Sequence, residues 1–157
     1  MADRRLIFDE LAGFLESGLS ITVGARDGDL RPEVVVAWAA RVNTDRDQLT
    51  IFLHKEAART ILRNLRTHPE IAVAFDLPTS HRACQIKGAF VSTRSARTGE
   101  RAEIERQVAA FNKDLEAIGF ARSMVLGWSV WPCAAIEFRV TEMFEQTPGP
   151  GAGERIS

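Results

Sequence analysis

Residues 70–90 read EIAVAFDLPTSHRACQIKGAF and hold two apolar runs on either side of a turn. Proline and small polar residues at 77–80 interrupt the runs and favour a tight reversal of the chain. β-branched and aromatic residues in short runs bounded by turn signals are typical of strands. The stretch therefore predicts two antiparallel strands, 70–77 and 82–93, with Gly88 as a bulge or a point of close backbone approach.

The second of these runs alternates in polarity. Cys84 and Ile86 fall on one side of an extended strand, and Gln85 and Lys87 fall on the other, because successive strand side chains point to opposite faces. The first side is expected to face the core. The second side faces either water, as is common in antiparallel sheets, or a ligand that needs an amide beside an ammonium group.

Further strands are expected on both sides of this pair. An Asp27-Gly28-Asp29 turn separates two β-rich runs, and the Asp-Gly pair is expected to supply a positive φ. A polar turn at 43–47 precedes the next run, and a last alternating run comes near the C-terminus. With the pair above, the predicted strands are 19–26, 31–42, 48–54, 70–77, 82–93 and 133–145.

Three helices are predicted from apolar residues at helical spacing. They cover 3–16, 57–67 and a longer stretch that follows Thr98-Gly99-Glu100 and ends at Gly119. The pattern indicates a mainly β, α+β protein: a six-stranded antiparallel barrel with peripheral helices, because a curled sheet protects its edges by closing. We expect one domain over 1–147 and a Pro/Gly-rich tail at 148–157 without a packing pattern.

Composition excludes several classes of function. The chain has 157 residues, 45% hydrophobic and 26% charged, with a formal net charge of −1. A chain with that charge has no global field that favours nucleic acid or an anionic membrane. Cys84 and Cys133 lie in apolar runs, and we expect both thiols to be buried and reduced. With neither a secretory signal nor a membrane-spanning run, the sequence predicts a cytoplasmic protein.

The sequence has no hydrolase elbow, metalloprotease motif or phosphate loop, and its three histidines are scattered. A basic cluster is more informative. His54 and Lys55 end one predicted strand, and Arg59, Thr60 and Arg63 follow at the start of the next helix. Helix starts carry partial positive charge and unpaired N–H donors, so an anion site is one interpretation. The other is the solvated face of an amphipathic helix.

The order of these elements carries a resemblance. A basic helix with RNLRTHPEIAVAF, and then PTSHRACQIKGAF, resembles the pyridoxamine 5′-phosphate oxidase-like family of FMN-binding split barrels. The likeness spans about residues 11–145. The tail FEQTPGPGAG is similar to the tails of small members of that family.

The resemblance implies a homodimer with FMN in clefts between two subunits. It places the FMN phosphate near Arg59 and Thr60, with His54, Lys55 and Arg63 as further candidates. It also places one strand along the flavin ring, although Trp38 by itself is more typical of a core residue. The residues near the ring would be Val36, Ala37 and Trp38, with Gln85 and Lys87 from the strand before Gly88.

The motifs also depart from those of the oxidases. Their Ser-Arg-Lys phosphate cluster corresponds to Ala58-Arg59-Thr60, and their strand glutamine aligns with Ala83, two residues before Gln85. The tail has no counterpart of their substrate-binding Arg and His, so we do not expect oxidation of pyridoxamine phosphate.

Three hypotheses remain open on the sequence. The first is an FMN-dependent oxidoreductase that acts on a small molecule, with Gln85 and Lys87 tuning the ring. The second is a protein that binds flavin, haem or a deazaflavin without turnover. The third is a dimeric barrel without a cofactor.

Overall fold

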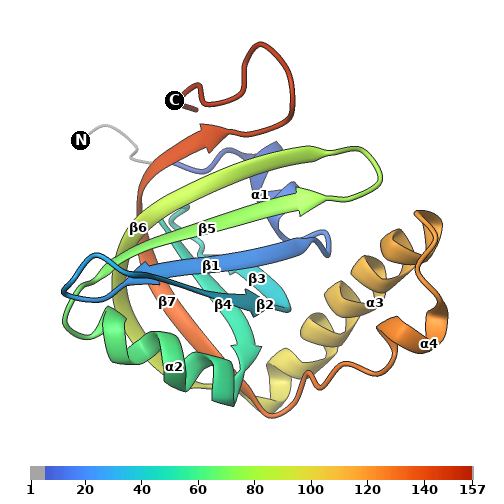
Figure 1. Ribbon diagram of the computed structural model, residues 1–157, viewed down its shortest axis with the longest axis horizontal. Helices are drawn as coiled ribbons and strands as arrows, with labels where there is room; N and C mark the ends of the chain where they lie inside the picture. The colour runs from blue at the N-terminus through green and yellow to red at the C-terminus, as the bar shows by residue number, and fades with distance from the viewer. Residues whose placement is uncertain (1–5, 157) are drawn as a thin grey trace.

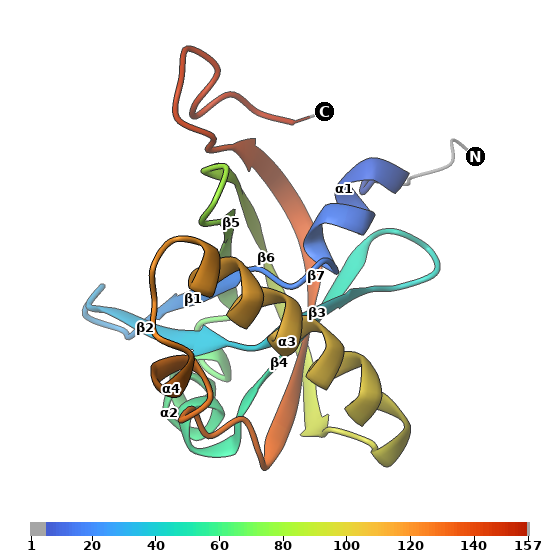
Figure 2. The same ribbon diagram turned by 90° about the vertical axis from the view of Figure 1, so that its right-hand side faces the viewer.

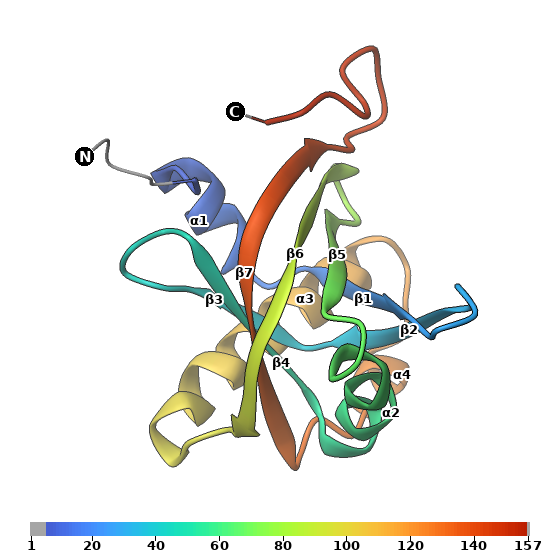
Figure 3. The ribbon, with the colours of Figure 1, turned by 90° about the vertical axis from the view of Figure 1, so that its left-hand side faces the viewer.

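The computed structural model describes residues 6–156, which form a seven-stranded antiparallel sheet curled into a half-open barrel (Figure 1). The strand order is β2-β1-β5-β6-β7-β4-β3. In the strand order β6 and β7 lie at the centre of the sheet, and Figure 3 shows them side by side, with β5 next to β6. The strands are β1 (Ser20–Arg26), β2 (Pro32–Ala37), β3 (Ala39–Val42), β4 (Gln48–His54), β5 (Glu70–Leu77), β6 (Arg82–Ser95) and β7 (Cys133–Glu145).

The sheet closes through a strand that the sequence predicts as one piece, 31–42. It divides at Trp38 into β2, which pairs with β1 at one edge of the sheet, and β3, which pairs with β4 at the other. The backbone N–H of Trp38 donates to the Phe52 carbonyl at 2.7 Å and fixes the bend. One chain segment therefore joins both edges of the sheet, and six predicted strands become seven.

The first two helices differ from their predicted bounds. Helix α1 is Asp9–Leu15, whereas 3–16 was expected; residues 3–5 lie outside the described chain. Residues 6–8 are not helical, since the N–H groups of Leu6 and Ile7 both donate to the Arg46 carbonyl. Helix α2 is Lys55–Leu65 and begins two residues early, because His54 caps it.

The long predicted helix is α3 (Arg101–Ala117), preceded by the 3-10 turn η1 (Thr98–Glu100). Helix α3 lies across the barrel, with the short α4 (Arg122–Val125) beside its far end (Figure 2). At this end Asp114 accepts hydrogen bonds from the backbone and hydroxyl of Thr79, in the β5–β6 turn. Helix α3 is thus tied to the barrel near both of its ends. None of the helices within 6–156 is long and apolar enough to cross a membrane.

The β1–β2 turn achieves its reversal differently from the expectation. The positive φ lies at Leu30, at 65°, and not at Gly28. The Asp27 carboxylate accepts hydrogen bonds from the N–H groups of Asp29 and Arg31, each at 2.9 Å. The side chain of Asp27 therefore shapes the loop, as acidic residues often do in turns.

The core has two parts, and β4 is buried between them. Ile51 and Leu53 face the main core inside the barrel, whereas Phe52 faces a smaller core between the outer sheet face and α3. Cys84 belongs to the main core and Cys133 to the smaller one, and both are free thiols, as predicted. Burial raises the pKa of Cys84 to about 12 and the pKa of Cys133 to about 11.

Gly88 is a site of close backbone approach, as the sequence predicts. The pairing of β6 with β7 shifts between Lys87 and Gly88. A Cβ at Gly88 would overlap the Arg139 carbonyl oxygen and would lie 2.6 Å from a ring carbon of Phe138. Only glycine fits this crossing without a shift of the neighbouring strand.

The C-terminal tail is more ordered than its composition suggests. It turns back after β7, so that Phe144 pairs with Arg155 and the Ile156 N–H donates to the Met143 carbonyl at 2.8 Å. The side chain of Ile156 packs against the main core. The tail thus packs against the core. The sequence did not reveal this contact, because it depends on one isolated isoleucine in a Pro/Gly-rich run. The division into 1–147 and 148–157 stays a prediction.

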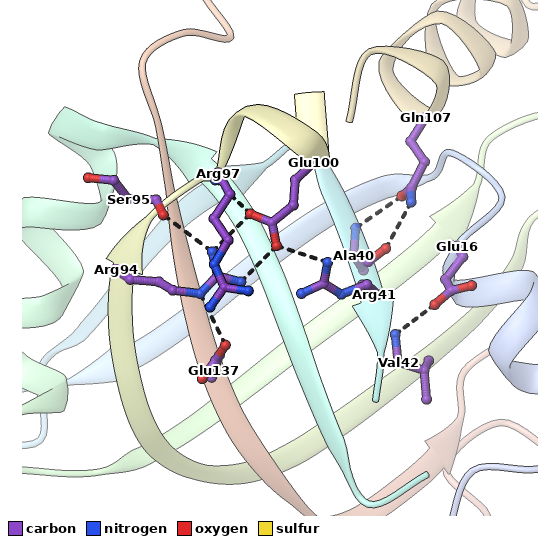
Figure 4. Close-up of polar contacts among 10 residues, drawn as sticks. All are labelled: Glu16, Ala40, Arg41, Val42, Arg94, Ser95, Arg97, Glu100, Gln107 and Glu137. Carbon is purple, nitrogen blue, oxygen red and sulfur yellow. Dashed lines mark hydrogen bonds and ion pairs between the residues drawn. The ribbon is translucent and has the colours of Figure 1, made fainter. Parts of the chain in front are cut away.

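Side chains from α3 and from the residue after α1 protect the edge strand β3 (Figure 4). The Gln107 amide donates to the Ala40 carbonyl at 2.8 Å and accepts from the Ala40 N–H at 3.0 Å. Glu16 accepts from the Val42 N–H at 2.7 Å. These groups take the place of a neighbouring strand, so that this edge cannot recruit one.

Glu100 anchors the start of α3 to the sheet. Its carboxylate accepts two hydrogen bonds from Arg94, at 2.7 and 2.8 Å, and lies 2.8 Å from the Arg41 guanidinium (Figure 4). The Arg97 backbone N–H is a further donor, at 2.7 Å. The Arg94 hydrogen bonds are the main reason that the Glu100 pKa falls to about 2, despite burial, which opposes the shift.

Candidate functional site

A basic hollow of about 230 Å³ lies between α2 and the end of β6; we call it the α2 hollow. Its floor is apolar, because Ala58 and Leu62 are the buried face of the amphipathic α2. Four cations line it: Lys55 and Arg59, four residues apart on one side of α2, Arg66 just after the end of that helix, and Arg94 on β6. The lining residues are Lys55, Ala58, Arg59, Leu62, Arg66, Thr93, Arg94, Ser95 and Ala134.

The electrostatics of the α2 hollow favour an anion. The start of the 11-residue α2 adds its partial positive charge to those of Lys55 and Arg59. The Glu56 carboxylate lies 3.0 Å from Arg59, and both side chains are exposed. Arg94 is already held by Glu100 and Glu137. Lys55, Arg59 and Arg66 are therefore the groups that can turn toward a phosphate.

Two predicted phosphate ligands have other roles, and a third lies outside the hollow. The two ring nitrogens of His54 contact the Glu56 N–H, at 3.3 Å, and the Trp131 carbonyl, at 3.1 Å. The Thr60 hydroxyl donates to the Glu56 carbonyl at 3.2 Å. Arg63 is exposed on α2 but outside the lining of the hollow. His54 and Thr60 thus complete the local hydrogen bonding of the helix start, and Lys55 and Arg59 remain as predicted ligands.

The hollow also contains residues that the sequence did not single out as ligands. Thr93 and Ser95 lie two apart on β6 and so share a face, but the predicted strand ended at 93 and gave no reason to extend it. Arg66 was not among the predicted ligands either. Its spacing of seven from Arg59 was the available signal, because it returns to the same side of a helix after two turns.

The residues predicted to lie near a flavin ring are split between faces. Val36 on β2 is exposed, whereas the Ala37 side chain is buried in the main core. Ala37 is therefore unable to offer its side chain to a ligand, since alternation along the strand turns it inward. Trp38 is half-buried, with its ring centroid 5.5 Å from that of Trp128.

Gln85 and Lys87 lie apart from the α2 hollow. Lys87 lines a second hollow, of about 420 Å³, over β1, β5, β6 and β7. The Lys87 ammonium group lies 4.9 Å from the centre of the Phe144 ring. Gln85 is half-buried and is paired in the sheet with Ala74 and Phe144. One copy of the chain therefore does not bring the two halves of the predicted site into one cavity.

Solved structures share this architecture. HupZ from Group A Streptococcus has a TM-score of 0.55 at 15% identity, over 94% of this chain and 99% of its own. An FMN-binding protein from Syntrophomonas wolfei has 0.54 at 14% identity, over 90% and 86% of the two chains. A candidate pyridoxamine 5′-phosphate oxidase from Lactobacillus delbrueckii has 0.53 at 12% identity, over 88% and 93%.

No family model and no curated protein matches the sequence. At such low identities the likeness to solved structures concerns the fold. The fold is the split β-barrel of the pyridoxamine 5′-phosphate oxidase-like, FMN-binding proteins, as the order of sequence elements predicts.

Proposed function

We propose that this protein is a cytoplasmic, homodimeric FMN-binding oxidoreductase that acts on a small molecule. The observation that carries the proposal is the α2 hollow, which is lined by Lys55 and Arg59 from the first turns of α2 and by Arg66 from just after its end. A phosphate dianion fits this set of donors, because each cation can form a charge-assisted hydrogen bond to it. The fold supports FMN as the source of that phosphate.

Two observations support a dimer. The α2 hollow, at about 230 Å³, falls below the roughly 300–1,000 Å³ of typical ligand pockets, so the remainder of FMN would need walls from elsewhere. Large apolar side chains are also exposed on the α3–α4 region, and such exposure marks interaction surfaces. We call this set the apolar arm: Ile118, Phe120, Met124, Leu126 and Trp128.

Different residues of the chain would contact different parts of FMN. Lys55, Arg59 and Arg66 hold the phosphate and so fix the position of the cofactor. Val36 and Trp38 offer apolar surface on the same subunit. Gln85 and Lys87 of the second copy would contact the far side of the ring. There the Lys87 ammonium group would stabilise negative charge on the reduced flavin. Bound FMN would supply the hydride or electron transfer.

A second candidate is binding of flavin, haem or a deazaflavin without turnover. One observation favours it: within the described chain, the lining of the α2 hollow includes neither a carboxylic acid nor a histidine. A site of this kind can hold a cofactor, but it offers no evident acid or base for proton transfer.

Titration of the purified protein with FMN and with riboflavin tests the role of the hollow. FMN should bind more tightly, since riboflavin lacks the phosphate. Arg59→Ala and Arg66→Ala should each weaken FMN binding by about 1.5–3 kcal/mol, roughly 10- to 150-fold, and leave riboflavin unaffected. Arg63→Ala is the matched control, on the same helix but outside the hollow. Equal affinities for FMN and riboflavin would show that the α2 hollow does not bind the FMN phosphate.

Stopped-flow reduction of the FMN-loaded protein by NADH and NADPH separates the two candidates. An oxidoreductase should be reduced faster than free FMN by one of these donors. Reduction at the rate of free FMN with both donors would favour binding without turnover.

A further inference from the structure

His54 joins the start of α2 to the segment that precedes β7. It is the N-cap residue of α2, and its ring Nδ1 accepts a hydrogen bond from the Glu56 N–H at 3.3 Å. Its Nε2 lies 3.1 Å from the Trp131 carbonyl oxygen. The backbone N–H of Lys55 donates to the Pro132 carbonyl at 2.8 Å. Hydrogen bonds thus hold the helix start against the segment before β7, while the same imidazole ring caps the helix.

These contacts select one protonation state of the ring. A carbonyl oxygen only accepts, so Nε2 must carry a hydrogen, and a backbone N–H only donates, so Nδ1 must not. The neutral ring with its proton on Nε2 satisfies both partners, whereas the imidazolium has a hydrogen on each nitrogen and satisfies one. Its Nδ1–H would point at the Glu56 N–H. The ring cannot turn away from Glu56 without also losing the Trp131 carbonyl.

The charges around His54 also oppose its protonation. The titratable groups of the neighbouring elements are Lys55, Glu56 and Arg59 from α2, Arg101 from α3, which lies over the Trp131 ring, and Cys133 from β7. Cations outnumber carboxylates in this set, and the helix start adds partial positive charge. Burial keeps the Cys133 thiol uncharged by raising its pKa to about 11. Histidine is the side chain that ordinarily changes charge between pH 5 and 8.

The cap fixes groups that line the α2 hollow. Lys55 is the first residue of α2, Arg59 follows one turn later, and both line the hollow. A helix start without its cap has additional unpaired N–H groups and frays from that end. Loss of the His54 cap would therefore release the two cations nearest the helix start. Arg66, beyond the other end of α2, would keep its place.

We propose that His54 is a pH-dependent positioning residue, whose neutral ring holds the start of α2 so that Lys55 and Arg59 meet a ligand phosphate, and whose protonated ring releases them. The inference deepens the proposed function and rests on it for the identity of the ligand, FMN. FMN would then bind more weakly in acid. An added positive charge alone would have the opposite effect, because it attracts the phosphate, so the pH profile distinguishes positioning from simple charge.

Fluorescence titration with FMN at pH 7.5 and 5.5 tests the proposal. Between these values the unmodified protein should lose roughly 3- to 10-fold more affinity than His54→Asn, whose amide oxygen can cap the helix at either pH. The FMN phosphate takes up a proton near about pH 6, but this affects both proteins equally. His81→Asn should follow the unmodified protein; it replaces an exposed histidine at a positive φ, 59°, which asparagine tolerates. An equal or smaller loss in the unmodified protein than in His54→Asn would overturn the proposal.

NMR of the protein without FMN separates this inference from the proposed function. At pH 7.5 the His54 ring should carry its proton on Nε2. The Glu56 amide resonance should shift between pH 7.5 and 5.5 in the unmodified protein and stay in place in His54→Asn. A proton on Nδ1 at pH 7.5, or the same Glu56 shift in both proteins, would contradict the switch. If the switch is seen but FMN does not bind at pH 7.5, the proposed function is wrong and the pH-dependent cap stands.

Discussion

At the scale of single residues, Glu100 shows how one side chain can fix a helix to the sheet. It is buried, and its donors come from β3, β6 and its own turn. The low pKa of its carboxyl makes stability depend on pH in a definite direction. A carboxyl with a lowered folded pKa contributes stability above its ordinary pKa, 4.5, and loses that contribution as the pH falls toward about 2.

We expect Glu100→Gln to lower the free energy of unfolding by about 2 kcal/mol at pH 7, because it removes a charge that Arg41 and Arg94 surround. The difference from the unmodified protein should shrink as the pH falls below 4.5. Urea unfolding at several pH values measures both. Glu105→Gln, which breaks an exposed pair with Arg101, should change little. A gap that stays constant with pH would contradict this account.

The candidate site could be predicted in part from its residues. The basic spacing in α2 pointed to Lys55 and Arg59, which line the hollow. His54 and Thr60, which the same reasoning named, use their polar atoms in hydrogen bonds at the helix start, and residue type does not reveal such competition. Ser95 could not be predicted either, since its role depends on where β6 ends against α2.

At the scale of elements, the crossing at Gly88 can be tested with a pair of glycines. Gly88→Ala should lower the free energy of unfolding by about 3 kcal/mol, because the added methyl group meets the β7 backbone. Gly13→Ala, in the interior of α1 with open space around it, should raise it by about 0.5–1 kcal/mol. Thermal or urea unfolding gives both values. Similar losses in the two variants would argue against the crossing.

Most elements follow from sequence pattern, because alternation and helical spacing are local signals. The division at Trp38 does not, since VVVAWAARV keeps strand-like composition across it. The bend follows from the pairing of Trp38 with Phe52, which lies on β4 and is distant in sequence. Similarly, α1 starts late because Arg46 pairs with the residues before it.

At the scale of the whole molecule, the apolar arm predicts self-association. Leu126→Lys should shift the protein from dimer to monomer in sedimentation experiments while its melting temperature at low concentration stays the same, because Leu126 is 64% exposed. Val91→Lys is the matched control, with an exposed apolar residue on β6 outside the arm. An unmodified protein that sediments as a monomer, or a Leu126→Lys dimer, would exclude the arm as the interface.

The fold class followed from the order of elements along the chain, and the likeness to solved split barrels confirms it. Closure of the sheet and the placement of α3 across it depend on contacts between distant segments, such as Gln107 with Ala40. Local patterns carry no information on such contacts.

The division of the core has a practical consequence, because each part contains one thiol. Cys84 lies in the larger part and Cys133 in the five-residue part below α3. Thiolates are the reactive form, and both pKa values are raised, so a thiol reagent must wait for a local opening. The labelling rate of each thiol thus reports the local opening of its own part of the core. Cys133 should be labelled first. Mass spectrometry of timed samples would show whether the barrel and the α3 region open together or apart.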